Sequence, residues 1–338
     1  MPRLARIDAP GALHHVIVRG IEQRKIFQDE ADRRDFLSRL GSAIERTKTH
    51  CFAWALLPNH FHLLLETGLK PVGRVMQSVL TGYALAFNRR HKRSGHLFQN
   101  RFKSILCERD EYLLELVRYI HLNPLRAGLV RGMSVLDHFP WSGHATLVGK
   151  QETRFQSIDE VLRLFGKIER EARAKYRLFV EEGIDRGHRL DLVGGGLIRS
   201  LGGWEAVMEA RRSREHHAYD ERILGSSDFV IGALKAAREK ERRGVRFRRE
   251  GWTPERVLRK AAQVVGVRPS ALLGDGRRRA LRRRPLCIAR ALACKWLVAD
   301  LDMKGTDVAK LLGISTPAVG FAVARGVEIE KERGIRLG

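Results

Sequence analysis

Two histidines one residue apart, His60 and His62, stand in a largely apolar run from Phe52 to Glu66. In an extended strand, residues i and i+2 point to the same face, so both imidazoles can reach one ion while Phe61 packs on the other side. Neutral imidazoles suit a first-row divalent ion, and two histidines leave coordination positions open, which a structural zinc site does not. The spacing predicts a metal site on one face of a strand.

A tyrosine and an asparagine, Tyr119 and Asn123, lie four residues apart in a stretch of helical character, so they share one helix face. A divalent ion can bind a phosphate oxygen and act as a Lewis acid on the phosphorus, and a tyrosine can attack it in line. A phenol has an ordinary pKa of about 10, so the attack needs the metal or nearby cations to favour the phenolate. The cations available in the sequence are Arg101, Lys103 and Arg118.

Each of these residues also has a structural interpretation. A lone His-x-His is more often a pair of partly exposed side chains, and the tyrosine and asparagine favour the metal site here. Tyr83, on an apolar helical stripe, and Tyr112, two turns before Tyr119, are the rival nucleophiles. We prefer Tyr119 because it alone has a carboxamide at i+4. His121 falls on a different helix face, and we expect it to be structural.

Alternating strand and helix signals surround these residues and predict an α+β fold, a ferredoxin-like βαββαβ sheet with helices against one face. We expect the domain to span residues 1–150. The predicted elements are a strand at 14–20, a helix at 29–47, strands at 51–57 and 60–66, a helix at 71–91, a strand at 98–107 and the helix of Tyr119.

Several longer motifs carry a family resemblance. The runs Leu57–Leu64 and Arg118–Gly128, supported by His14–Gly20, Gly95–Phe102 and Phe139–Ser142, resemble the REP-associated tyrosine transposases, a group of single-tyrosine HUH transposases. The resemblance covers about the first 150 residues.

The resemblance implies His60 and His62 as ligands of Mg²⁺ or Mn²⁺, Asn123 as the third ligand and Tyr119 as the nucleophile. It implies a bacterial single-strand DNA endonuclease and strand transferase that cleaves hairpin-flanked, REP-like palindromic DNA through a 5′-phosphotyrosine intermediate. The oligomeric state stays open. The rival interpretations are a DNA-binding regulator without catalysis and a metal-dependent hydrolase of small phosphoesters, which would leave the basic charge unused.

The composition supports a nucleic-acid partner. Lys and Arg number 63 against 39 Asp and Glu, a net charge of +24, and the pI is near 10.7. We expect a cytoplasmic protein with no membrane partner, since there is no apolar run of about 18 residues and no signal-peptide h-region. The four cysteines have no CxxC spacing and are expected in cores: Cys51, Cys107, Cys287 and Cys294.

Residues 151–250 are predicted to form a helical middle region with a basic linker. Its glycine-rich stretch at 187–203 lacks the lysine of a phosphate-binding loop and is better interpreted as a hinge. The basic run at 235–249 predicts a solvated helix.

Residues 251–338 are predicted to form a separate helix-turn-helix domain that binds duplex DNA. Thr253 is the expected N-cap of its first helix, and the stretch 306–325 has the layout of helix, glycine turn and second helix. The segments Val264–Gly274, Arg290–Ala293 and Val308–Gly313, together with the arginine cluster at 277–284, resemble the Trp-repressor-like DNA-binding domain of the bacterial replication initiator DnaA. The sequence departs from that pattern in the recognition helix, where Ser315–Ala322 replaces the usual polar base-reading residues. The predicted DNA contacts of this domain are Arg277, Arg278, Arg279, Arg282, Arg283, Arg284, Ser315 and Thr316, and those of the first domain are Arg101, Lys103 and Arg118.

Overall fold

The computed structural model of the chain describes residues 7, 8, 11–185, 192, 220–273 and 284–337. The chain divides into two compact units between Ala233 and Leu234. Two apolar clusters form the core of the first unit and a third forms the core of the second.

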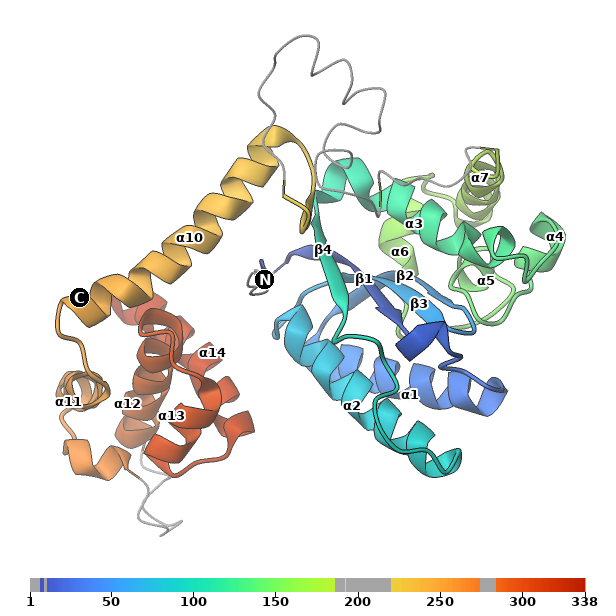
Figure 1. Ribbon diagram of the computed structural model, residues 1–338. Helices are drawn as coiled ribbons and strands as arrows, with labels where there is room; N and C mark the ends of the chain where they lie inside the picture. Colours follow the sequence, from blue (N-terminus) through green and yellow to red (C-terminus); the bar gives the residue numbers. More distant parts are fainter. Residues whose placement is uncertain (1–6, 9–10, 186–191, 193–219, 274–283, 338) are drawn as a thin grey trace, which may run out of the picture. The chain divides into compact units, whose positions relative to one another are not determined.

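The first unit is built around a five-stranded sheet (Figure 1). Its elements are β1 (Leu13–Arg19), η1 (Ile21–Gln23), α1 (Glu30–Thr47), β2 (His50–Leu56), β3 (His60–Glu66), α2 (Val72–Arg90), β4 (Lys103–Cys107), α3 (Arg109–Arg126), α4 (Met133–Leu136), α5 (His144–Leu147), α6 (Ile158–Arg163), α7 (Glu169–Glu181) and β5 (Ile223–Leu224).

The strands lie in the order β2-β3-β1-β4-β5. The first four pair antiparallel, and β5 pairs parallel with the edge of β4. In the ladder between β1 and β3, Arg19 lies opposite His60 and Ile17 lies opposite His62. Directly opposite residues share a face of the sheet, so this register decides which side chains of β1 surround the two histidines.

Helices cover both faces of the sheet, which corrects the prediction of helices against one face (Figure 1). α1 and α2 pack on the face that carries Val16, Val18 and Phe61. α3 packs on the opposite face, over Leu13 and Leu64. Both faces of β3 are therefore buried, and this is why the strand is an almost continuous apolar run rather than an alternating one.

The predicted elements around the two histidines are present with small shifts in their bounds. α1 begins after Asp29, whose side chain accepts a hydrogen bond of 3.0 Å from the backbone N–H of Asp32 and caps the helix. The last predicted strand is shorter than expected, because β4 begins at Lys103 and Phe98 makes only an isolated bridge to Gly20.

The first unit continues well past residue 150. α6 and α7 add Val161 and Tyr176 to the same apolar cluster as α3, and β5 adds Leu224. Residues 158–181, which were expected to belong to a separate middle region, are therefore packed as part of the first unit. The glycine-rich stretch at 187–203 lies outside the described residues except for Leu192, which is buried in that cluster.

The second unit is helical. α10 (Ser227–Arg249) crosses the division between the units and is followed by α11 (Pro254–Val265), η3 (Pro269–Leu272), α12 (Arg284–Lys295), the π-helical η5 (Trp296–Asp300), α13 (Gly305–Leu312) and α14 (Thr316–Arg333). The side chain of Thr253 caps α11, as predicted. The C-cap of α13 is Gly313, which has a positive φ of 62°. The axes of α13 and α14 are bent by 98° across the three-residue break between them.

Within the described part of the chain, no single helix is long and apolar enough to cross a membrane. Only α13 and α14, taken together as a bent pair, have the required length and apolar composition.

Candidate metal and tyrosine site

The two histidines of β3 lie on one face of the sheet, as their spacing predicted. Their ring centroids are 5.3 Å apart in an edge-on arrangement. His60 stands at the start of the strand and is half-buried, whereas His62 is only 4% exposed. Phe61 points to the opposite face and packs in the core beneath α1 and α2.

α3 brings Tyr119 to the same face. The centroid of its ring lies 5.9 Å from that of His62 and 5.9 Å from that of His15 on β1. The tyrosine is 5% exposed, and its neighbours Leu116 and Ile120 anchor the helix in the core. The structure therefore brings the predicted nucleophile next to the predicted metal ligands.

Asn123 also has a structural role in α3. The helix continues through Pro124, which has no N–H to donate to the carbonyl of Ile120. The Nδ2 of Asn123 donates to the carbonyl oxygens of Tyr119 (2.9 Å) and Ile120 (3.4 Å), so the side chain replaces the missing donor. Since Nδ2 is used in this way, Oδ1 is the atom of Asn123 that can bind an ion.

Both HxH imidazoles are held in the neutral form. Burial, followed by the nearby charge of Arg19, lowers the pKa of His60 to about 4. Burial also lowers the pKa of His62 well below its ordinary value, with contributions from His15, His60 and Arg19. A neutral imidazole keeps a lone pair on one ring nitrogen, which is the form that binds a metal ion.

The tautomer of His60 follows from its hydrogen bonds. Its Nδ1 lies 2.7 Å from Oδ1 of Asn59. The orientation of that amide is set by its Nδ2, which donates to the carbonyl oxygen of Gln23 at 3.1 Å. Because a carboxamide oxygen only accepts, Nδ1 of His60 carries the proton and Nε2 carries the lone pair.

The predicted donor set is of a kind that suits a divalent ion with open coordination positions. Among the residues described, no group of three or more His, Cys, Asp and Glu side chains is arranged to hold a metal ion. The donors that the sequence predicts are two imidazoles and a carboxamide oxygen, from His60, His62 and Asn123. Such nitrogen and oxygen donors suit first-row divalent ions, and the carboxamide oxygen also suits Mg²⁺.

Of the cations predicted around the tyrosine, Lys103 shares the face of His62, Arg101 precedes β4, and Arg118 lies elsewhere. Lys103 is opposite Ile17 in the ladder of β1 and β4, so it shares the face of His62, and Arg101 is exposed just before β4. Arg118 lies away from the site, because its guanidinium is buried, pairs with Glu115 and packs over the ring of Phe179.

The sequence alone predicted no role in this site for four residues that lie at it: His15, Arg19, Asn59 and Arg126. The guanidinium carbon of Arg126 lies 5.3 Å from the ring centroid of Tyr119. The sequence holds a signal for this contact, because Arg126 follows Tyr119 by two helical turns and so shares its face.

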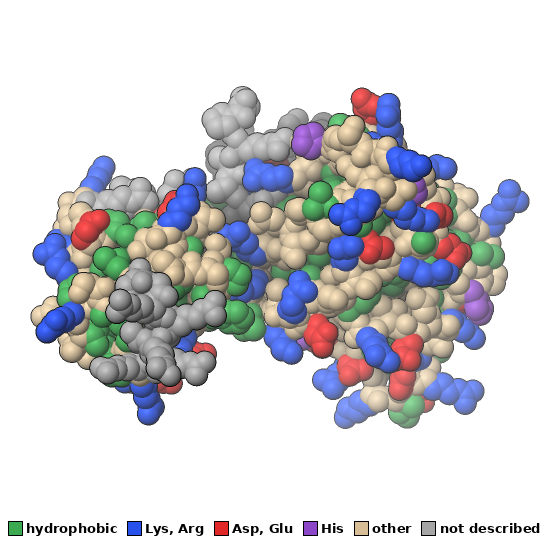
Figure 2. Space-filling model, turned by 90° about the horizontal axis from the view of Figure 1, so that it is seen from below, with side chains coloured by type: hydrophobic (Ala, Val, Ile, Leu, Met, Phe, Trp, Pro, Cys, Tyr) green, Lys and Arg blue, Asp and Glu red, His purple; other side chains and the backbone are tan. Residues whose placement is uncertain are grey.

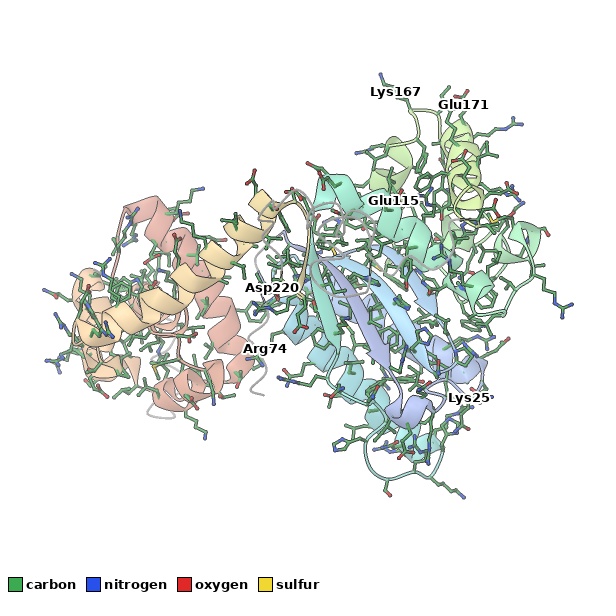
Figure 3. The ribbon with its side chains drawn as sticks, turned by 45° about the horizontal axis from the view of Figure 1, so that its top comes forward. Lys25, Arg74, Glu115, Lys167, Glu171 and Asp220 are labelled. Atoms are coloured by element: carbon green, nitrogen blue, oxygen red, sulfur yellow. The ribbon has the colours of Figure 1, made fainter. Side chains whose placement is uncertain are left out.

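A basic hollow lies near the start of β3. It has a volume of about 460 Å³ and is lined by Arg24, Lys25, Gln28 and Arg93. Lys25 belongs to the loop between β1 and α1 (Figure 3), and the loop is held to the residues before His60 by bonds from the N–H groups of Ile26 and Phe27 to the carbonyl of Pro58. Lys and Arg side chains are otherwise spread over the visible surface with Asp and Glu among them (Figure 2).

The predicted DNA contacts of the second unit are described in part. Arg277, Arg278, Arg279, Arg282 and Arg283 lie outside the described residues. Arg284 is the exposed first residue of α12. Ser315 caps α14 by accepting from the N–H of Ala318, and Thr316 is exposed at the first position of that helix.

Comparisons with known proteins point to DNA transposition. Residues 10–123 match the model of a family described as IS200-like transposases. A solved structure described as a REP-associated tyrosine transposase bound to a REP hairpin has a TM-score of 0.38 and 17% identity, over 47% of this chain and 90% of that chain. No curated protein matches. The family match supports DNA cleavage of the transposase type in general.

Proposed function

We propose that the first unit is a transposase-type nuclease of the ferredoxin-like HUH class, which cleaves single-stranded, hairpin-flanked DNA with Tyr119 as its nucleophile. The observation that carries the proposal is the placement of the Tyr119 ring 5.9 Å from that of His62, within a segment that matches IS200-like transposases. REP-like palindromes are the proposed substrate class.

In the proposed reaction, the Oη of Tyr119 attacks a backbone phosphorus. The new bond joins this oxygen to phosphorus, and the bond from phosphorus to the 3′ oxygen breaks. The phenol loses its proton, the departing 3′ oxygen takes one up, and the 5′ phosphate stays on the tyrosine. Attack by a 3′ hydroxyl reverses these steps and rejoins a strand, so the bond energy is retained.

His60, His62 and Asn123 would hold Mg²⁺ or Mn²⁺. Bound there, the ion would act as a Lewis acid on the scissile phosphate. The contribution of the chain itself is to keep both imidazoles neutral and to hold the tyrosine in a nearly buried position. Arg126 places a positive charge beside the phenol ring and favours the ionised nucleophile.

We further propose that the DNA backbone passes over the basic hollow. Arg24, Lys25 and Arg93 supply three cations, and Gln28 adds a neutral donor. Cationic side chains of this kind contact phosphates and position a strand without reading its sequence. The second unit is proposed to bind duplex DNA through α13 and α14 as a helix-turn-helix.

A labelled hairpin oligonucleotide, incubated with the full chain and Mn²⁺ and run on a denaturing gel, tests the nuclease. The expected result is a covalent protein–DNA adduct that disappears in Tyr119→Phe. Tyr112→Phe is the matched control, since Tyr112 lies on the same helix and is partly buried, and it should keep the adduct.

Two other outcomes separate the rival functions. Hairpin binding without an adduct would indicate a regulator. Repeated turnover of a small phosphoester with no adduct would indicate a hydrolase and would contradict the transposase mechanism.

A further inference from the structure

His15 of β1 is hydrogen-bonded to a proposed metal ligand. Its Nε2 lies 2.9 Å from Nδ1 of His62, and the side chains are 0% and 4% exposed. We infer that His15 is a positioning residue, which holds a proton on Nδ1 of His62 and leaves Nε2 of His62 as the metal-binding atom. The inference rests on the proposed function, because it concerns the same metal site.

One proton lies between the two nitrogens, and there are two ways to place it. If Nε2 of His15 donates, Nδ1 of His62 is the acceptor, and the neutral His62 ring then carries its proton on Nε2 and cannot bind an ion there. If Nδ1 of His62 donates, its Nε2 keeps the lone pair. Only the second arrangement makes His62 a metal ligand, because its Nδ1 is already occupied by His15.

The second arrangement also matches the neighbouring ligand. Asn59 accepts a proton from Nδ1 of His60 and leaves Nε2 of that ring with its lone pair. His60 and His62 would then use the same ring nitrogen, each oriented by a separate acceptor. Metal-binding histidines commonly donate their second N–H to such a partner, which fixes both the tautomer and the ring orientation.

The strand register explains why His15 and not His14 has this role. His15 precedes by two residues Ile17, which lies opposite His62, so His15 and His62 are diagonal neighbours on one face. His14 points to the other face, where its Nδ1 lies 3.1 Å from the Oγ of Ser104. His14 is 1% exposed, so it is a control of the same type, strand and burial.

The first test is Mn²⁺ binding to the full chain without DNA, followed by electron paramagnetic resonance. His15→Phe should weaken Mn²⁺ binding by about 10- to 100-fold, the range known for loss of such orienting partners. His15→Gln should retain most of the affinity, because its amide oxygen can accept from Nδ1 of His62. His14→Phe should bind Mn²⁺ like the wild type. Equal affinity in His15→Phe and wild type would overturn the inference.

The second test needs neither metal nor DNA. It can establish the tautomer of His62 even if His15→Phe does not fold. Long-range ¹⁵N–¹H correlation spectra of the histidine-labelled wild type report which ring nitrogen carries the proton, and a His62→Gln variant assigns the signals. A proton on Nδ1 of His62 supports the inference, and a proton on Nε2 contradicts it. This result is independent of adduct formation, so failure of the proposed nuclease and failure of this inference can be told apart.

Discussion

Tyr119 on α3 and His62 on β3 lie edge to face, with ring centroids 5.9 Å apart. The relationship depends on how α3 crosses the sheet, because apolar residues before and after the tyrosine bury the helix on the face that carries both histidines. The fold therefore brings the side chain proposed as nucleophile next to a proposed metal ligand.

Arg126→Gln should slow adduct formation about 10-fold, a barrier increase of about 1.4 kcal/mol. The guanidinium lies 5.3 Å from the centre of the Tyr119 ring, and a nearby positive charge favours the ionised phenol. Arg126→Lys should lose less activity than Arg126→Gln, because it keeps the charge. Single-turnover cleavage of the hairpin measures both variants. Equal rates in wild type and Arg126→Gln would show that the charge does not assist the attack.

The strand and the helix that carry the candidate site residues were predictable from residue spacing within each segment. The i, i+2 spacing of His60 and His62 predicts a strand face, and the i, i+4 spacing of Tyr119 and Asn123 predicts a helix face; both are confirmed in β3 and α3. Local pattern succeeds here because each spacing lies within one element, where geometry follows from the backbone alone.

Features that depend on pairing between distant segments were not predictable. The register of β1 against β3 decides whether His14 or His15 faces the site. This register cannot be derived from the sequence of β1 alone. β5 is a strand of only two residues, Ile223–Leu224, too short to show a periodicity. The helices on two faces, by contrast, had a local signal that the prediction did not use, because the almost continuous apolar run of β3 is typical of a strand buried on both sides.

Acid should destabilise the first unit through a second set of histidines. His121, expected to be structural, is 0% exposed and bonds to the Tyr176 hydroxyl at 2.7 Å, and that hydroxyl also bonds to His144 at 2.9 Å. Burial is the main cause that lowers the pKa of both imidazoles below the ordinary 6.5, with the charge of His144 adding to the effect on His121.

The sign of the effect follows from proton uptake. Below pH 6.5 the unfolded imidazoles bind protons that the folded ones do not, so the free energy of unfolding falls as the pH falls. Each histidine contributes a slope of up to about 1.4 kcal/mol per pH unit. Methyl NMR spectra in increasing urea, recorded between pH 7.5 and pH 5, would follow each unit separately. His121→Gln should show a shallower loss than wild type, and an equally steep loss would rule out His121 as a source.

Neutralising the basic hollow should weaken DNA binding without affecting catalysis at saturation. In the triple variant Arg24→Gln, Lys25→Gln, Arg93→Gln, up to three phosphate contacts are lost, so the slope of log affinity against log salt should fall by as much as about three. Fluorescence anisotropy with a hairpin at several salt concentrations measures the slope.

The matched control is the triple variant Arg34→Gln, Arg39→Gln, Arg46→Gln. It removes the same charge from α1, where Arg34 and Arg39 pair with acidic residues one turn earlier. Its salt slope should stay near that of the wild type. If both triple variants lose affinity and slope equally, the effect belongs to net charge and the hollow is not a contact site.

Gly326→Ala should unfold or strongly destabilise the second unit. Gly326 lies on α14 where it crosses α12, and a Cβ there would stand 2.3 Å from the carbonyl oxygen of Ala291 and 2.7 Å from Cβ of Lys295. Overpacking of this kind costs about 1–3 kcal/mol or more, because the helices must move apart. Gly305→Ala is the control, since a Cβ there meets no atom within 4 Å, and the change should be neutral or slightly stabilising.

The same pair of variants tests whether cleavage belongs to the first unit and duplex binding to the second. Gly326→Ala should lose duplex binding, measured by a gel-shift assay, and should still form the adduct with a hairpin, because the nuclease residues lie in a unit with its own cores. Gly305→Ala should keep both activities. Loss of the adduct in Gly326→Ala, with the first unit still folded by NMR, would show that cleavage requires the second unit. Unchanged duplex binding in a Gly326→Ala protein whose second unit is unfolded would rule out that unit as the duplex-binding one.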